Sequence, residues 1–361
     1  MLAFLPPDER LPGTLAALAA AWPESLRFGC EAVTQFADDA LTTGGSVQLF
    51  WFESAEHGAA VEVISGTHAD PPAPEAVAAL AGRLAEADGA LLIADGLRFP
   101  AELFLNELRH GLNGSAPRAA GGLASQSEPV ARIGARVFVG MEVYPAACLA
   151  VTFRGVHLRV EVVRGWTPAS PVYVVTRAEG NVLREIDGAP AADWYRRFFT
   201  IEGELAPLPE SAHRFPLILE GPGPERQGLY RSLRFFDEPP GAVTLWGEIR
   251  TGDRVRLGIG NEASLVGVAA ALAGGESEAG TETRTNAEAA ILYSCVGRQA
   301  VLGERAGEEV AAIHRRLGGV SLSGFFTFGE IGPAPGGSLA FYNHTAILVL
   351  LAEVPHPKGH S

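Results

Sequence analysis

Apolar and polar positions follow the same order three times along the chain. In each copy an apolar strand leads to an amphipathic helix, then to a strand with a glycine in its middle, then to a further apolar strand. The three copies span residues 2–52, 91–153 and 291–351. Their helices are predicted at Thr14–Trp22, Pro100–Gly111 and Glu308–Leu317. The alternation predicts an α/β fold built from repeated β-α-β-β units.

The stretches between the copies indicate mixed sheets and two domains. Valine-rich runs at residues 158–163 and 172–176 add antiparallel strands, so we expect mixed β-sheets flanked by helices. A chain of 361 residues has the length of about two domains. Proline and glycine are dense from 205 to 240, so we place an N-terminal domain at 1–202 and a C-terminal domain at 203–355. Residues 356–361 are expected to form a disordered tail.

A segment rich in Gly, Ser, Thr and Glu occupies residues 274–285. This composition predicts a mobile surface loop just before the third copy. The loop is either a lid or a solvated connection, and the sequence leaves both open.

Charge and hydropathy exclude several classes of function. The net charge is −14, and Lys358 near the C-terminus is the only lysine. No basic patch is available for nucleic acid, and no lysine is placed for a Schiff base or a phosphate loop. No apolar run reaches the roughly 18–20 residues of a membrane helix, and the N-terminus lacks a signal-peptide pattern. We therefore expect a cytoplasmic protein without a membrane or nucleic-acid partner.

Cysteine and histidine spacing gives no metal site. Cys30, Cys148 and Cys295 are widely separated, and none belongs to a CxxC pair. The nine histidines include no pair at ligand spacing. We expect no cofactor, although a haem needs a single axial histidine and therefore stays open.

Polar residues gather between apolar strands in the third copy. Buried polar groups are costly, so their concentration near loops and strand ends predicts a small-molecule pocket. The candidate ligand-binding residues are Cys295, Arg298, Ser323, Gly324, Phe325, Thr327, Gly329, Glu330, Asn343, His344 and Thr345.

Strand geometry suggests how these residues meet. A period of two places Leu322 and Phe326 on one face of a strand, with Phe325 and Thr327 on the face that is free for a ligand. If residues 332–337 close a hairpin, His344 lies opposite Phe326 and beside Thr327. Alternatively, His344 only caps the strand through backbone bonds.

Arg298 follows the strand at residues 290–294, at the end of a sheet where ligands tend to bind. Its guanidinium suits a ligand carboxylate, and Glu330 suits an ammonium group. A structural salt bridge between the same two side chains is the alternative. Cys295 is either a small buried hydrophobe or a nucleophile paired with His344.

These motifs resemble the FIST-domain family. The C-terminal half carries the Cys…Gly-Arg set at 295–298, the run Gly-Phe-Phe-Thr-Phe-Gly-Glu-Ile-Gly-Pro at 324–333 and Asn-His-Thr at 343–345. The N-terminal half resembles the family at Asp-Gly-Leu 95–97, Gly-Gly 121–122 and Glu-Ile-Asp-Gly-Ala-Pro-Ala 185–191. Residues 29–35 read Gly-Cys-Glu-Ala-Val-Thr-Gln, where the family often has a Gly-Cys-Ser-Thr-Ala-Gly-Glu type of run.

The resemblance implies an intracellular sensory module for signal transduction. It implies a small ligand, with amino acids as the expected class, and an output through a separate partner such as a histidine kinase in trans. No catalysis is expected. Three alternatives stay open: a haem-based nitric-oxide sensor, as some members are; a cysteine-dependent acyl-transfer enzyme; and a scaffold whose polar cluster only organises the fold.

Overall fold

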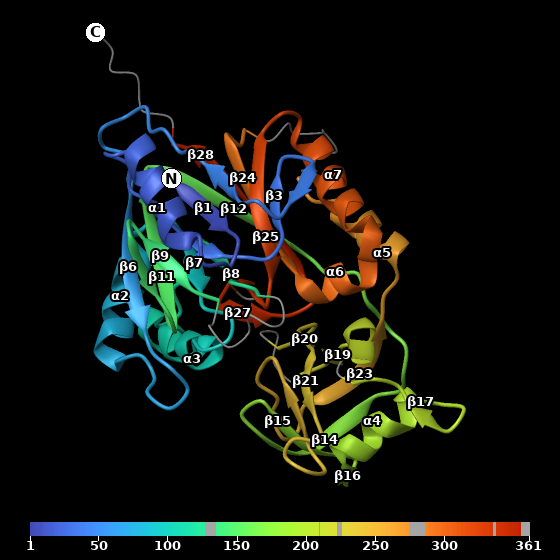
Figure 1. Cartoon of the computed structure of the whole chain (residues 1–361). Coiled ribbons are helices and arrows are strands. Elements are labelled where there is room, and N and C mark those ends of the chain that lie inside the picture. Colours follow the sequence, from blue (N-terminus) through green and yellow to red (C-terminus); the bar gives the residue numbers. More distant parts are fainter. Residues whose placement is uncertain (127–134, 209, 222–225, 274–285, 335–336, 355–361) are drawn as a thin grey trace, which may run out of the picture.

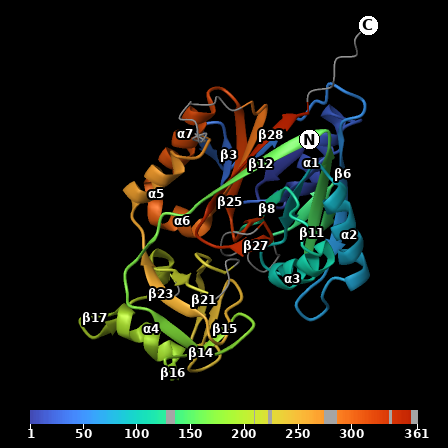
Figure 2. The same ribbon diagram turned by 180° about the vertical axis from the view of Figure 1, so that it is seen from behind.

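The computed structural model of the chain describes residues 1–126, 135–208, 210–221, 226–273, 286–334 and 337–354. The predicted loop at 274–285 and the predicted tail at 356–361 lie outside this part of the chain. Figure 1 shows a larger body, which contains the N-terminal and C-terminal parts of the chain, and a smaller lobe, which is formed by the middle of the chain. Figure 2 shows the same two bodies from behind.

The three predicted repeats are present as three equivalent units of the larger body. In each unit two parallel strands are joined by a crossover that contains a helix, and a later strand pairs antiparallel with the first. The units are β1 (Leu2–Leu5), α1 (Leu11–Ala21), β2 (Phe28–Glu31) and β5 (Ser46–Gln48); β7 (Gly89–Ala94), α3 (Ala101–Leu112), β8 (Ala119–Leu123) and β11 (Ala147–Arg154); and β24 (Ala289–Cys295), α7 (Ala306–Leu317), β25 (Ser321–Thr327) and β28 (Ala346–Glu353).

The glycine in the middle strand of each unit has the same physical role. Gly29, Gly121 and Gly324 each lie opposite a residue of the first strand, and a Cβ added there would lie 1.7, 1.7 and 1.9 Å from that residue's carbonyl oxygen. Any side chain would collide with the backbone of the first strand, so close strand approach requires glycine. The repeat is therefore encoded in local sterics as well as in hydrophobic period.

Each unit donates a hairpin to the sheet of another unit, and the exchange is cyclic. The hairpin after β2, formed by β3 (Gln35–Ala37) and β4 (Ala40–Thr42), pairs with β25. The hairpin after β8, formed by β9 (Val137–Val139) and β10 (Glu142–Tyr144), pairs with β2. The hairpin after β25, formed by β26 (Glu330–Pro333) and β27 (Leu339–Tyr342), pairs with β8. The strands β6 (Gly58–Ser65) and β12 (Val156–Val163) complete two of the sheets.

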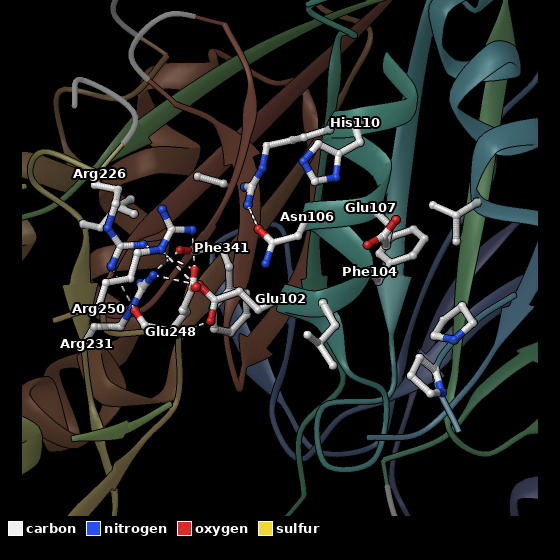
Figure 3. A pocket seen from close by; sticks show the side chains of 17 residues that line it. Glu102, Phe104, Asn106, Glu107, His110, Arg226, Arg231, Glu248, Arg250 and Phe341 are labelled. Carbon is white, nitrogen blue, oxygen red and sulfur yellow. Dashed lines mark hydrogen bonds and ion pairs between the residues drawn. The ribbon is translucent and has the colours of Figure 1, made fainter. Parts of the chain in front are cut away.

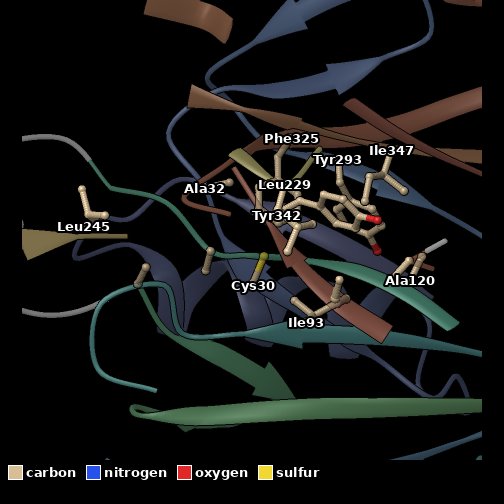
Figure 4. Packing of buried hydrophobic residues seen from close by; sticks show 14 of the residues in the cluster. Cys30, Ala32, Ile93, Ala120, Leu229, Leu245, Tyr293, Phe325, Tyr342 and Ile347 are labelled. Carbon is tan, nitrogen blue, oxygen red and sulfur yellow. The ribbon is translucent and has the colours of Figure 1, made fainter. Parts of the chain in front are cut away.

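The inner faces of the three sheets share one apolar core. Alternate residues of the first strands point into it, among them Phe4, Ile93 and Tyr293, together with Phe325 from β25. Figure 4 shows this packing. The opposite faces are covered by helices: α1 on one sheet, α2 (Pro74–Glu86) and α3 on the second, and α5 (Glu262–Ala269), α6 (Val296–Leu302) and α7 on the third. Both faces of β25 are therefore packed, and the expected ligand-facing side of this strand is core.

The smaller lobe leaves the larger body after β12 and rejoins it at α5 (Figure 1). It is an antiparallel sheet with α4 packed on one side. Its elements are β13 (Thr167–Pro168), β14 (Tyr173–Glu179), β15 (Val182–Ile186), β16 (Ala189–Pro190), α4 (Ala191–Phe199), β17 (Thr200–Ile201), β18 (Glu204–Leu205), the 3-10 helix Glu210–Arg214, β19 (Leu217–Leu219), β20 (Tyr230–Arg231), β21 (Leu233–Phe236), β22 (Val243–Leu245) and β23 (Arg254–Ile259); a further 3-10 turn, Gly303–Arg305, follows α6.

Two sheets of the larger body combine strands from both halves of the chain. Residue 203, where the sequence predicted a boundary, lies between β17 and β18 inside the smaller lobe. The division of the chain at that point stays a prediction.

Candidate functional site

Glu330 is the centre of a buried polar cluster at the start of β26. Its Oε1 accepts a hydrogen bond from the Thr327 hydroxyl. Its Oε2 accepts the Thr345 hydroxyl at 2.6 Å and the Thr345 backbone N–H at 3.2 Å. Burial raises the pKa of Glu330 to about 7, although these hydrogen bonds act in the opposite direction. The cluster therefore holds a carboxyl group that gains or loses its proton near neutral pH.

Arg298 does not pair with Glu330. Its partner is Glu309 on α7, whose Oε1 accepts Nε at 2.8 Å and also the Nη2 group. Arg298 further donates to the carbonyl oxygens of Arg164 and Leu265. The guanidinium is fully buried, and its hydrogen bonds join α5, α6, α7 and the start of the lobe. The salt bridge between Arg298 and Glu330, which the sequence left open as the alternative to ligand binding, is therefore not formed, because Glu309 on the helix that follows takes the guanidinium.

His344 occupies a strained position beside the cluster. Its φ is +58°, in the left-handed region that non-glycine residues seldom adopt. The ring packs against Gly297, where an added Cβ would lie 2.5 Å from Cε1, and it meets the Trp166 ring edge-on at 4.9 Å. Among the described residues neither ring nitrogen has a hydrogen-bond partner. Burial lowers the pKa of His344 to about 3, assisted by His213 and Arg298, so the imidazole is neutral.

The expected hairpin register is also wrong. The hairpin pairs Glu330 with Tyr342 and does not extend back to Phe326, because β25 instead pairs with β24 and β3. His344 is therefore not opposite Phe326. Asn343 bridges the two bodies, since its Oδ1 accepts the backbone N–H of Ser232 at 3.4 Å.

Cys295 is buried, and burial together with the nearby Glu330 carboxyl raises the pKa of its thiol well above the ordinary value. The ring nitrogens of His344 make no hydrogen bond to it. The thiol–imidazole pair that an acyl-transfer enzyme requires is thus not formed in this structure.

The remaining candidates are packing residues in the described fold. Ser323 donates its hydroxyl to Gln48, and Phe325 lies in the central core. Gly324 lies against the backbone of β24, and Gly329 lies against the Phe341 ring. All eleven predicted site residues are buried, and they are Cys295, Arg298, Ser323, Gly324, Phe325, Thr327, Gly329, Glu330, Asn343, His344 and Thr345. Glu330 bonds to Thr327 and Thr345 in closed packing, whereas Arg298, Ser323 and Asn343 bond to residues outside the predicted set.

The same packing bears on haem. A haem ligated by His344 would need an open space in front of a ring nitrogen, whereas this ring is fully buried between Gly297 and Trp166. His344 does not fit the role of axial ligand. Within the described ranges no group of three His, Cys, Asp or Glu side chains could hold a metal ion.

An open cavity lies elsewhere, between α3 and the smaller lobe. Its volume is about 580 Å³, which is within the usual range for small-molecule sites. Helix α3 supplies one wall, and the chain from 226 to 250 supplies the other (Figure 3). Glu102 in the first turn and Arg109 in the last turn suit the helix dipole, and Asn113 ends the helix in a left-handed conformation. The buried side of α3 fixes its polar side toward the cavity.

Most arginines that line this cleft are held by carboxylates. Arg226 binds Asp253 at 2.6 Å, Arg231 binds Glu102 at 2.8 Å and Arg250 binds Glu248 at 2.7 Å. Glu102 also accepts the backbone N–H of Glu248, which connects α3 directly to the lobe.

Arg109 differs from these arginines. It donates to the Leu339 carbonyl at 2.8 Å and to the Asn106 side chain, both neutral acceptors. Burial lowers its pKa, but a guanidinium stays protonated. Glu107 on the same helix lines the cavity, is exposed, and has no partner among the described residues. Among the described residues of the cleft, Arg109 is therefore a cation and Glu107 an anion that form no ion pair.

Comparison with known families identifies the architecture. The FIST N domain matches residues 1–189, and the FIST C domain matches residues 191–333. The chain belongs to the FIST family. FIST domains are associated with sensory signal transduction. In FIST terms the cleft lies between the two domains, because α3 belongs to FIST N and residues 226–250 belong to FIST C.

Relatives of this FIST protein are found in mycobacteria. An uncharacterised protein of Mycobacterium tuberculosis is 28% identical over 271 residues, which is 73% of this chain and 68% of the relative. An uncharacterised protein of Mycobacterium bovis is 26% identical over 271 residues, which is 73% of this chain and 67% of the relative. In the part of the chain that the structure covers, no helix has the length and apolar character needed to cross a membrane.

Sequence reasoning missed the cleft because its residues come from distant segments. The wall from α3 and the wall from the lobe are more than a hundred residues apart. A usable signal was the cluster of arginines and acidic residues from 226 to 253, which begins within the stretch at 205–240 that was noted only for its proline and glycine.

Proposed function

We propose that this FIST protein is a cytoplasmic sensory module that binds a small amino-acid-like carboxylate in the cleft between its two domains. The observation that carries the proposal is the cavity of about 580 Å³ lined by charges of both signs. A zwitterion needs a donor for its carboxylate and an acceptor for its ammonium group. Arg109 and Glu107 supply these two groups without breaking an existing ion pair.

The position of the cleft supports a sensory role. A ligand held by α3 and by residues 226–250 contacts both FIST domains at once. Such a ligand stabilises one arrangement of the two bodies over others, which is how binding shifts a conformational equilibrium. We propose that a separate partner, such as a histidine kinase in trans, reads this arrangement.

Ligand contact by the buried C-terminal cluster stays a prediction. A ligand would reach Glu330 or Arg298 only after strands or helices had separated, since both side chains have no exposed surface. We therefore assign the first contact to the cleft.

Thermal unfolding with a panel of the standard amino acids and simple carboxylates tests the proposal. A ligand that binds only the folded state raises the Tm by mass action. We expect at least one zwitterion to raise the Tm of the wild-type protein, and Arg109→Gln to remove that shift. Arg315→Gln, which removes an exposed guanidinium on α7, should retain it. A panel in which no amino acid or carboxylate changes the Tm would refute the ligand class.

A further inference from the structure

A second compartment adjoins the cleft, on the other side of the contact between Glu102 and Glu248. Its volume is about 190 Å³. Its lining includes His68, Gly96 and Leu97 from the FIST N domain and Arg234 and Trp246 from the FIST C domain. It shares Glu102 and Glu248 with the larger cavity. The compartment is too small for most drug-sized ligands, but it is large enough for a compact polar group.

Aromatic rings hold the Arg234 guanidinium in this compartment. Its Cζ lies 4.3 Å from the centroid of the Trp246 ring and 5.0 Å from that of Phe235. Trp246 in turn stacks on Phe328 with ring centroids 5.4 Å apart and an interplanar angle of 24°. Stacking of this kind fixes the guanidinium plane and leaves its N–H groups available for bidentate bonds.

No group in the described structure neutralises Arg234. Within those residues it makes neither a hydrogen bond nor an ion pair, whereas Arg226, Arg231 and Arg250 are each held by a carboxylate. Glu102 and Glu248 border the compartment, but their oxygens are already bonded to other partners. Burial lowers the pKa of Arg234 without removing its charge. The compartment therefore contains an uncompensated cation.

His68 adds a second polar group, which has no hydrogen-bond partner among the described residues. It lines the same compartment, and burial together with Arg234 lowers the pKa of its imidazole. At neutral pH the ring is therefore uncharged, and it can donate one hydrogen bond to an acceptor beside the guanidinium. Arg234 and His68 together have donors in excess of acceptors.

We propose that this compartment is an oxyanion site in which Arg234, stacked on Trp246, binds a carboxylate or phosphate group. Bidentate guanidinium geometry matches both groups. His68 from FIST N and Arg234 from FIST C would then contact the same anion, so the anion connects the two domains independently of Arg109. The site accepts either a separate small anion or the acidic end of a larger molecule.

The test measures thermal unfolding at constant ionic strength while chloride is replaced by inorganic phosphate in one series and by acetate in another. We expect one or both anions to raise the Tm of the wild-type protein along a saturating curve. Arg234→Gln should weaken the apparent Kd at least tenfold, and Arg315→Gln should leave it unchanged. The series that saturates tells whether the site takes a phosphate or a carboxylate.

General salt effects and misfolding are separated from binding by further variants. Anion exclusion stabilises every variant alike and does not saturate. Arg234→Lys keeps the charge but loses the planar fork, so we expect it to bind several-fold more weakly than the wild type. A saturating curve in Arg109→Gln separates this site from the amino-acid site. Unchanged affinity in both Arg234 variants, or the lack of any saturating curve in the wild type, would overturn the proposal.

Discussion

The buried ion pair between Arg298 and Glu309 provides a quantitative test of the packing around the polar cluster. Glu309→Leu removes the acceptor of three hydrogen bonds, two from Arg298 and one from the Ser294 hydroxyl at 2.8 Å. The guanidinium remains, and both side chains of the pair are 0% exposed. Removal of one partner of a buried pair costs about 3–5 kcal/mol. We expect a loss of that size in the free energy of unfolding.

A double variant separates the cost of the unpaired charge from the cost of lost hydrogen bonds. Arg298→Met combined with Glu309→Leu removes both charges of this buried pair. It still removes a donor from the carbonyls of Arg164 and Leu265 and an acceptor from Ser294, at about 1 kcal/mol each. We therefore expect the double variant to be no less stable than Glu309→Leu alone.

Urea unfolding followed by tryptophan fluorescence measures these differences as shifts in the midpoint at equal slope. A loss of less than about 1 kcal/mol in Glu309→Leu would contradict the expected cost of an unpaired charge in the core. A double variant less stable than Glu309→Leu would show that the unpaired charge is not the dominant contribution to the loss of stability.

Three further outcomes are expected. Folded Glu330 keeps its proton up to about pH 7 while the unfolded chain releases it near 4.5, so stability should fall as pH rises between these values, by up to about 3 kcal/mol; urea titrations should show this slope in the wild type and its loss in Glu330→Gln. Gly121→Ala should prevent stable folding because its Cβ meets the Leu92 carbonyl oxygen, whereas Gly82→Ala, with nothing within 4 Å on helix α2, should raise the Tm slightly, by about 0.5–1 kcal/mol of stability. Iodoacetamide at pH 7.5 should leave Cys295 unlabelled in the folded protein, as mass spectrometry would show, because the buried thiol stays protonated; rapid labelling would contradict this.

The repeats were predictable because their signals are local. Hydrophobic period and a central glycine identify each unit within about sixty residues, and all three helices lie within three residues of their expected starts and one of their expected ends. The hairpin exchange was not predictable, because β3 and β25 are nearly three hundred residues apart and nothing in either strand specifies the other. Pairing at that range is decided by which edge is left free in the folded body.

The candidate site shows the same limit. Part of the predicted clustering is present, since Glu330 accepts hydrogen bonds from Thr327 and Thr345, but Arg298, Ser323 and Asn343 bond to residues outside the predicted set. The burial of these residues could not be predicted from their spacing, because it depends on how helices α5, α6 and α7 pack on the sheet. The sequence also could not distinguish Glu309 from Glu330 as the partner of Arg298, because both carboxylates are within reach of a guanidinium in an unknown fold.

The cyclic exchange of hairpins has a consequence for how such a molecule can be divided or assembled. A polypeptide with a single β-α-β-β unit would have its own hairpin without a host sheet and its own sheet with a bare edge. Three such polypeptides arranged about a rotation axis would give each hairpin a host sheet by the same pairings that one chain makes internally. A single chain thus has the arrangement of a closed trimer of similar units. Fragments produced by cutting the chain between units should therefore recover their structure by binding one another.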